Sequence, residues 1–160
     1  MRTRTLQVML IEDNDDHAEL VAAALEVNNL VGNVIRFADA ESGLDYLIGE
    51  TRAKRKTENP LPDLILLDLM LPGMSGMEML KILKQQPRTK SIPVIVLTTS
   101  SLDSKIDKAY ELGANSYIAK PIGHQDFVIK LAELNMFWSV TAELPRPVDE
   151  ESNTSKESLF

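Results

Sequence analysis

Short apolar runs with strand character alternate with helical segments along most of this chain. The strand-like runs occupy residues 6–11, 31–37, 63–67, 93–97 and 116–119. Apolar residues recur at helical spacing after each run, for example over residues 40–49 and 78–86. Strands that alternate with helices of about ten to fifteen residues indicate a parallel sheet in an α/β fold. Right-handed crossovers then place helices on both faces, which predicts a doubly wound architecture.

Periodicity does not determine the strand order, but five β-α units in a row suit the flavodoxin-like order 2-1-3-4-5. We therefore predict a five-stranded parallel sheet of the (βα)5 type. One folded domain is expected over residues 1–138. Beyond Trp138 the composition shifts to a proline-containing stretch and a polar tail, so residues 139–160 are expected to form an extension that is largely disordered at its end.

Composition restricts the class of protein. With 160 residues, of which 44% are hydrophobic and 26% charged, the chain suits one soluble domain with a full core. Its apolar stretches are strand-sized and far shorter than the roughly 20 residues of a membrane span. The basic N-terminus lacks the apolar length of a signal peptide, and cysteine is absent. Both features favour a cytoplasmic protein without disulfides.

The net charge of −7 argues against nonspecific nucleic-acid binding, which requires Lys and Arg to neutralise phosphates. Nucleotide-binding glycine loops are absent after the first strand, and neither a cysteine nor a G-x-S-x-G turn supports a nucleophilic hydrolase. His17 and His124 each fall in the first turn of an expected helix, and we expect both to face solvent.

Reactive polar groups follow four of the strand-like runs. Glu12 and Asp13 follow the first run, Asp68 the third, Thr98 the fourth and Lys120 the fifth. The carboxyl ends of parallel strands meet at one edge of the sheet, where open α/β folds place their ligands. Carboxylates are hard oxygen ligands of the kind that Mg²⁺ prefers, and a lysine or hydroxyl can bind phosphoryl oxygens. The edge therefore predicts a Mg²⁺-assisted phosphoryl-transfer site.

Each of these residues also has an ordinary structural interpretation. Glu12 and Asp13 suit the start of a helix, Asp68 and Lys120 can be solvated loop residues, and Thr98 can be a turn or capping group. These roles are common singly. Their coincidence at successive strand ends favours the site.

The chain resembles the receiver domain of two-component response regulators, and the resemblance covers roughly residues 6–137. It rests on five motifs taken together, namely Ile11-Glu12-Asp13-Asn14, the run from Leu67-Asp68-Leu69-Met70-Leu71-Pro72-Gly73 to Gly76, Val96-Leu97-Thr98-Thr99-Ser100, Gly113-Ala114-Asn115-Ser116-Tyr117 and Lys120-Pro121.

This resemblance implies a role for each site residue. Asp68 is the implied phosphoacceptor. Glu12 and Asp13 form the acidic pair that binds Mg²⁺ together with Asp68, and the backbone carbonyl of Met70 is a further implied ligand.

The resemblance also implies a switch. Thr98 is the hydroxyl that closes on the phosphoryl group, and Lys120 is its salt-bridge partner. Tyr117 is the aromatic residue whose rotamer follows Thr98. Receivers of this family commonly have a cis peptide at the step that corresponds here to Lys120-Pro121.

Finer features look like the single-domain regulators paired with cyanobacterial and bacterial phytochromes. These features are the basic loop over residues 51–62, the Leu-Thr-Thr-Ser run, and Asn135-Met136-Phe137-Trp138. They imply a sensor histidine kinase, of phytochrome type, as phosphodonor. With no room for a DNA-binding domain after Trp138, output is expected through protein contacts. The surplus apolar residues near Trp138 suggest a homodimer contact or packing onto the protein's own core.

Three functions compete at this point. The first is a phosphorylatable signalling switch, which is not an enzyme beyond its own phosphoryl transfer and slow dephosphorylation. The second is a degenerate receiver that binds partners independently of phosphorylation. The third is a small aspartyl-phosphate phosphohydrolase, which would need a cap domain. The complete set of site residues favours the first.

Overall fold

A computed structural model describes the protein over residues 5–26, 31–49, 60–99 and 103–120. Within these ranges, the sheet is parallel, has five strands and follows the order β2-β1-β3-β4-β5, which confirms the predicted topology. The strands are β1 (Leu6–Ile11), β2 (Val31–Phe37), β3 (Leu64–Asp68), β4 (Val94–Thr98) and β5 (Ser116–Ala119). Two of them, β3 and β4, lie one residue further along the chain than predicted.

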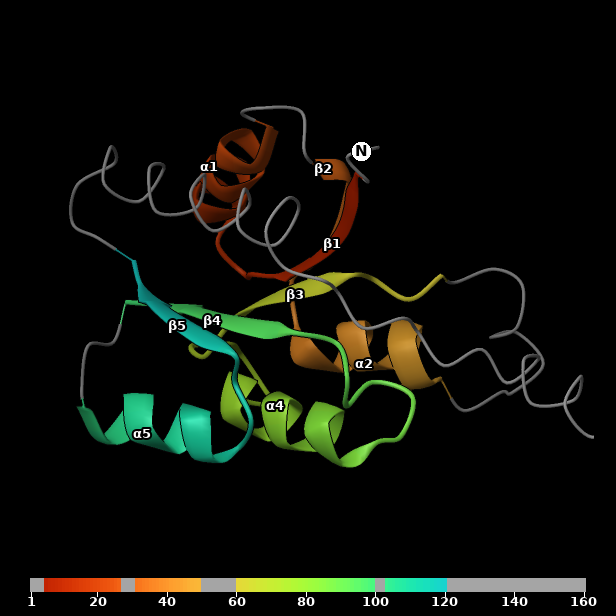
Figure 1. Cartoon of the computed structure of the whole chain (residues 1–160). Helices are drawn as coiled ribbons and strands as arrows, with labels where there is room; N and C mark the ends of the chain where they lie inside the picture. The colour runs from red at the N-terminus through yellow and green to blue at the C-terminus, as the bar shows by residue number, and fades with distance from the viewer. Residues whose placement is uncertain (1–4, 27–30, 50–59, 100–102, 121–160) are drawn as a thin grey trace, which may run out of the picture.

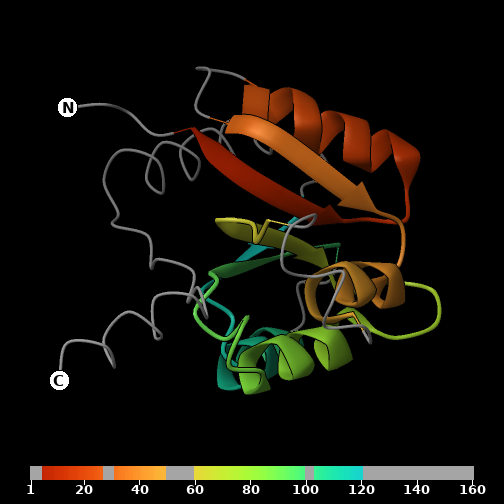
Figure 2. The same cartoon turned by 90° about the vertical axis from the view of Figure 1, so that its right-hand side faces the viewer.

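Helices cover both faces of the sheet. They are α1 (Asp15–Glu26), α2 (Ala40–Ile48), α4 (Gly76–Gln85) and α5 (Asp103–Glu111). In Figures 1 and 2, α1 lies on one side of the sheet, whereas α2, α4 and α5 lie on the other. This is the doubly wound arrangement that right-handed crossovers predict.

Alternation of side chains along the strands produces two apolar cores. Ile65 and Leu67 of β3 belong to the core beneath α2, α4 and α5, and Leu64 and Leu66 belong to the core beneath α1. All of them are at most 1% exposed. A strand buried on both faces reads as a continuous apolar run, which is why residues 64–67 show no polar alternation.

The same alternation assigns the polar residues at the strand ends to one face or the other. Glu12 and Asp68 continue the series of alternate residues that face α1, and Lys120 follows Ile118 of the same core by two positions. Thr98 continues the series of Val94 and Val96, which face the opposite way. Because side chains alternate with a period of two, the strand ends supply polar groups to both sides of the sheet.

Several predictions concern residues outside the described ranges. They include the Lys120-Pro121 peptide, His124, Trp138 and the extension over residues 139–160. Within the described ranges, no helix combines the length and the apolar character that crossing a membrane would require.

Candidate functional site

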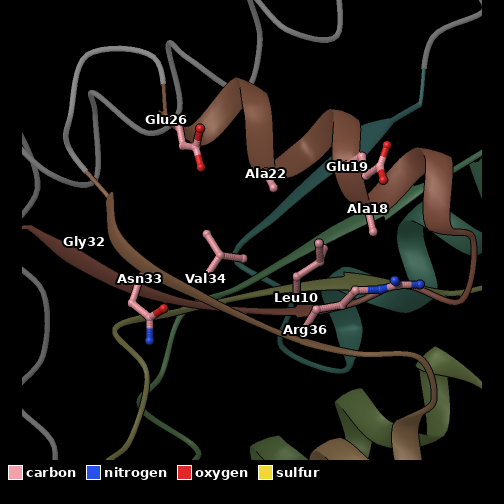
Figure 3. A pocket seen from close by; sticks show the side chains of 9 residues that line it. All are labelled: Leu10, Ala18, Glu19, Ala22, Glu26, Gly32, Asn33, Val34 and Arg36. Carbon is pink, nitrogen blue, oxygen red and sulfur yellow. The ribbon is translucent and has the colours of Figure 1, made fainter.

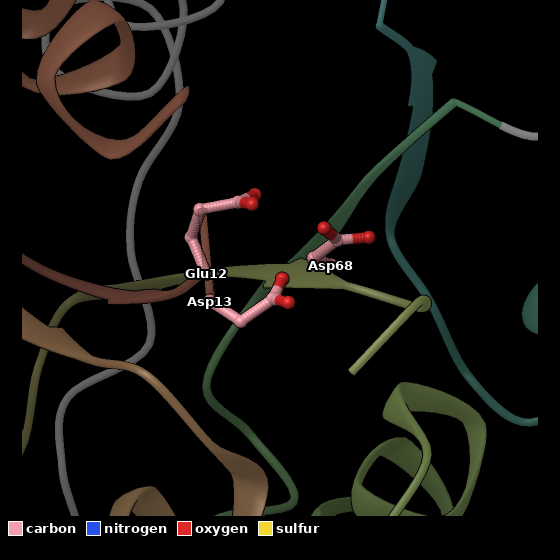
Figure 4. Close-up of side chains that lie close together, drawn as sticks. All are labelled: Glu12, Asp13 and Asp68. Carbon is pink, nitrogen blue, oxygen red and sulfur yellow. The ribbon is translucent and has the colours of Figure 1, made fainter. Parts of the chain in front are cut away.

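Three carboxylates meet at the carboxyl edge of the sheet. One oxygen from each of Glu12, Asp13 and Asp68 lies within 4.8 Å of the others (Figure 4). Asp68 is the last residue of β3 and Glu12 directly follows β1, and the pairing of Ile11 with Leu67 places these two strand ends side by side. Glu12 and Asp68 are buried, whereas Asp13 is exposed. The structure thus brings together the acidic residues that the sequence placed at adjacent strand ends.

Lys120 joins the two buried carboxylates. Its Nζ lies 2.5 Å from Glu12 Oε2 and 3.0 Å from Asp68 Oδ2, and the side chain is 7% exposed. The Lys120 backbone N–H donates to the Thr98 carbonyl, which extends the ladder between β4 and β5 by one residue. An ammonium has three N–H donors, and His17 Nδ1, at 3.1 Å, is in place to accept the third.

Burial makes the cluster costly to ionise. Desolvation by burial and the nearby charge of Asp68 raise the pKa of Glu12, the Lys120 ammonium lowers it, and the net result is a pKa of about 7. A carboxyl group with this pKa holds a proton for part of the time near neutral pH. A second positive charge at the cluster would favour the fully ionised form.

The donor set suits a hard divalent cation. Mg²⁺ takes oxygen ligands and is commonly bound by one or two carboxylates with waters completing the shell. Glu12, Asp13 and Asp68 offer such oxygens, and one of the three is open to solvent. The Met70 backbone N–H donates to Asp68 Oδ1 at 3.0 Å, so the main chain of Met70 runs close to the cluster.

Hydrogen bonds fix the loop between β1 and α1, which carries Glu12 and Asp13. The Asn14 backbone N–H donates to Glu12 Oε1 at 3.2 Å, and Asn14 Oδ1 accepts from the His17 N–H at 3.0 Å at the start of α1. From the edge strand β2, Arg36 Nε donates to the Glu12 carbonyl at 3.1 Å. Arg36 also pairs with Asp15 at 2.7 Å. The acidic loop is therefore held by both its own helix and the neighbouring strand.

The loop that follows Asp68 ends against the backbone of β3. A Cβ added at Gly76 would lie 2.6 Å from the Leu69 Cα and would also collide with the Asp68 carbonyl oxygen, so only glycine allows α4 to approach so closely. Ser75, the residue before Gly76, forms a reciprocal capping box with Glu78. The box satisfies two helix-terminal N–H groups and sets the start of α4.

A residue of α2 holds the middle of the same loop. Glu41 Oε1 accepts a hydrogen bond from the Met74 N–H at 2.8 Å. The preceding Gly73 has a φ of +72°, and a Cβ there would lie 2.7 Å from the same Glu41 oxygen. Glycine is therefore required both by the backbone conformation and by the close carboxylate.

The two residues of the expected switch lie on the other side of the sheet. Thr98 is fully buried at the end of β4. Tyr117 is partly exposed, packs against the core beneath α2, α4 and α5, and is paired with Val96. Val96 precedes Thr98 by two positions, so Thr98 and Tyr117 occupy neighbouring places on one face.

A groove of about 410 Å³ lies elsewhere, between α1 and the edge strand β2 (Figure 3). Its apolar part consists of Leu10, Ala18, Ala22 and Val34, and Glu19, Glu26 and Arg36 contribute charged groups. None of the acidic cluster lines it. The predicted site is thus the cluster of charged side chains at the carboxyl edge rather than the groove.

Sequence reasoning missed two contributors to the site. His17 is 42% exposed, so it does face solvent in part, but its Nδ1 contacts Lys120 and lies 3.6 Å from Glu12 Oε1. Its position one turn after the acidic pair, at the inward edge of the helix start, was the available signal. Arg36 gave no signal, because its partners lie more than 20 positions earlier in the chain.

Comparisons with known proteins identify the family of this chain. The sequence profile of the response regulator receiver domain matches residues 8–132. The probable methanogenesis regulatory protein FilR2 of Methanothrix harundinacea is 36% identical over 140 residues, which cover 88% of each chain. Response regulator Rcp1 of Synechocystis sp. is 34% identical over 139 residues, which cover 86% of this chain and 92% of Rcp1.

Solved structures give the same result. The phosphorylated cyanobacterial phytochrome response regulator RcpA superposes with a TM-score of 0.81 at 34% identity, covering 89% of this chain and 99% of RcpA. The Mn²⁺-bound form of Rcp1 superposes with a TM-score of 0.80 at 33% identity, covering 88% and 99%. Fold and sequence agree, and the chain belongs to the family of response regulator receiver domains.

Proposed function

We propose that this protein is a response regulator that accepts a phosphoryl group on Asp68 from a sensor histidine kinase and signals through protein contacts. The observation that carries the proposal is the ion cluster in which the Lys120 ammonium joins the buried carboxylates of Glu12 and Asp68. A structural ion pair needs one carboxylate for each ammonium. Here three carboxylates and one ammonium share the site, an excess of negative charge that suits a divalent cation and a transferable phosphoryl group.

Glu12, Asp13 and Asp68 would hold Mg²⁺, with the Met70 carbonyl as a further ligand. When bound, the cation offsets the repulsion between the carboxylate nucleophile and the phosphoryl oxygens. The Mn²⁺-bound form of the relative Rcp1 supports a divalent cation in a receiver of this kind.

Asp68 acts as the nucleophile. An Oδ–P bond forms as the P–N bond to the donor imidazole breaks. The electron pair of the P–N bond stays on the imidazole nitrogen, which takes up one proton from the solvent, so the donor leaves as a neutral histidine. Lys120, which already touches Asp68, binds a phosphoryl oxygen. Positioning and charge neutralisation supply most of the catalysis in such transfers.

Phosphorylation adds about −1.5 to −2 units of charge and strong hydrogen-bond acceptors at Asp68. Thr98 donates its hydroxyl to the phosphoryl group, and Tyr117 follows Thr98 on the same face of the sheet. Their neighbouring places on one face of the sheet support this coupling. A local change of charge thereby alters a surface that a partner can recognise.

The relatives suggest the upstream signal. RcpA is named as a phytochrome response regulator, and we propose a phytochrome-type kinase as the donor for this chain. We assign the receiver to residues 1–138 and an extension to residues 139–160, and we propose a cytoplasmic protein that neither binds nucleic acid nor enters a membrane. A homodimer contact near Trp138 completes the proposal.

Replacement of the nucleophile tests the proposal directly. Wild type and Asp68→Asn are incubated with Mg²⁺ and phosphoramidate, and intact mass spectrometry measures the phosphorylated fraction. We expect wild type to gain one phosphoryl group and Asp68→Asn to gain none, because an amide is nearly isosteric but is not a nucleophile. The matched control is Asp45→Asn, an exposed aspartate on α2.

Each outcome is informative. Phosphorylation of Asp68→Asn at the wild-type level would refute the assignment of the phosphoacceptor. A wild type that stays unmodified while it remains folded would favour the phosphorylation-independent binding module. Continuous turnover of the donor would favour a phosphohydrolase.

A further inference from the structure

Lys105 lies in the first turn of α5 and contacts the residue that follows the phosphoacceptor by two positions. Its Nζ is 3.9 Å from the Met70 Sδ. Among the described residues, this ammonium therefore contacts a sulfur rather than a carboxylate. Lys108 on the same helix is different, since it pairs with Glu111 at 3.9 Å.

Met70 connects Lys105 to the site. The Met70 N–H donates to Asp68 Oδ1, so one methionine residue separates the Lys105 ammonium from the phosphoacceptor. The Met70 side chain is 56% exposed, which places this contact at the open side of the cluster. A thioether is a weak acceptor, so the ammonium loses little when it turns toward an anion.

Before a divalent cation binds, the charges around Asp68 are mostly negative. The chain carries a net charge of −7, and the site itself contributes three carboxylates. Lys120 already contacts Glu12, Asp68 and His17, so its three N–H groups are engaged before the phosphodonor arrives. A second cation at the open side would offset the repulsion during approach.

We propose that Lys105 binds the phosphodonor through its anionic phosphoryl oxygens before transfer to Asp68. The inference rests on the proposed function and adds a binding residue to it. The ligand class is a phosphoryl group on nitrogen or oxygen, whether free in solution or carried on a histidine of a partner protein. The Lys105 side chain is long and partly exposed, which lets it follow the donor to the site.

The test measures phosphorylation rates against donor concentration for wild type, Lys105→Glu and Lys105→Arg. The donors are phosphoramidate, which represents a free phosphoryl compound, and monophosphoimidazole, which represents phosphohistidine. Lys108→Glu is the matched control, since it makes the same charge change on the same helix at a residue that already has an acidic partner. Circular dichroism confirms that each variant is folded.

We expect Lys105→Glu to raise the half-saturating donor concentration about 3- to 10-fold, with the maximal rate unchanged, and the effect to shrink at high salt. Lys105→Arg should restore most of the wild-type value, and Lys108→Glu should change it less than about 1.5-fold. A rise in the half-saturating concentration of monophosphoimidazole alone would assign Lys105 to the phosphohistidine source. A rise for phosphoramidate alone would assign it to free phosphoryl compounds.

Equal rises in the half-saturating donor concentration in Lys105→Glu and Lys108→Glu would overturn the proposal, because net charge would then explain both. Wild-type kinetics in Lys105→Glu would overturn it as well. Either result leaves the proposed function standing, because the proposed function fails only if wild type is not phosphorylated or if Asp68→Asn is.

Discussion

Two lysines at opposite ends of the sheet each gather three acceptors, and they do so in different ways. Lys120, at the carboxyl edge, contacts two carboxylates and an imidazole. Lys84, on α4, lies near the amino ends of β4 and β5. Its Nζ donates to the carbonyls of Lys90 and Ile92, at 3.3 and 2.9 Å, and to Asn115 Oδ1 at 3.2 Å.

The chemistry of the acceptors separates the two regions. The acceptors of Lys84 are main-chain carbonyls and an amide, which are neutral and do not titrate. Burial lowers the pKa of Lys84. The Lys84 cluster thus fixes the loop before β4 to the turn before β5. The acceptors of Lys120 are ionisable side chains, which a cation or a phosphoryl group can rearrange. Lys84 thus holds two loops of the fold together, whereas Lys120, under the proposed function, responds to a bound cation or phosphoryl group.

The largest expected effect on stability comes from removing the fixed lysine. Lys84→Met should lower the free energy of unfolding by about 2–4 kcal/mol, because it leaves carbonyl and amide acceptors without their donor. Phosphorylation of the folded variant should be unchanged. Urea denaturation measures the first quantity, and Lys81→Met, an exposed lysine on the same helix, is the control. A loss below about 0.5 kcal/mol, typical of surface substitutions, would refute the structural role.

Removing the responsive lysine should give a smaller loss that magnesium reverses. Lys120→Met leaves Glu12 and Asp68 without their ammonium, at a cost of about 1–3 kcal/mol in metal-free buffer, less than for a rigid pair because Glu12 can take up a proton. Mg²⁺ should restore this stability by mass action, but it should not rescue Lys84→Met. Rescue of both variants, or of neither, would remove the distinction between the two edges.

The pH dependence of stability should single out the carboxyl edge. The pKa of Glu12 is raised from 4.5 to about 7 on folding, so the folded protein binds more protons than the unfolded chain between these values. The stability that protonated Glu12 contributes to the folded protein is therefore complete below pH 4.5 and is lost as the pH rises through about 7. In metal-free buffer we expect the free energy of unfolding of Glu12→Gln to fall by roughly 1–2 kcal/mol less than that of wild type over this pH range.

Urea denaturation of wild type and Glu12→Gln at several pH values measures that difference. Glu111→Gln, an exposed acid on α5, makes the same charge change away from the site and should follow wild type. If Glu12→Gln follows wild type too, the carboxyl group of Glu12 is not the source of the decline.

The smallest effects compare one acceptor from each cluster. Asn115→Ala should cost about 1 kcal/mol, because Asn115 Oδ1 accepts from both Lys84 and the Val94 N–H. His17→Ala should cost less than about 0.5 kcal/mol, because the ring is 42% exposed and water can replace it. Thermal denaturation of the two variants shows which substitution destabilises the protein more. The reverse order would show that His17 is a structural contact rather than an adjustable one.

The carboxyl edge could be predicted from the sequence because it depends on local patterns. Apolar runs identified the strands, the alternation of elements gave a parallel sheet, and the end of each strand then located Glu12, Asp68, Thr98 and Lys120. No knowledge of long-range contacts was needed beyond the shared direction of the strands.

The amino edge could not be predicted in this way. Lys84 looks like an ordinary basic residue in the last turn of a helix. Its role depends on Asn115, which lies 31 positions later, and on the path of the loop between them. Arg36 was missed for the same reason, since side-chain contacts across elements leave no periodic trace in the sequence.

The loop between β3 and α4 has a consequence for how this protein can change in evolution. Gly76 fixes its end against the Leu69 and Asp68 main chain, and Glu41 holds Met74 in between. Such a loop accepts substitutions at its exposed positions, but an inserted or deleted residue would break one attachment or the other. Variants of this chain should therefore differ in the identity of residues 70–72 and keep the number of residues between Asp68 and Gly76 constant.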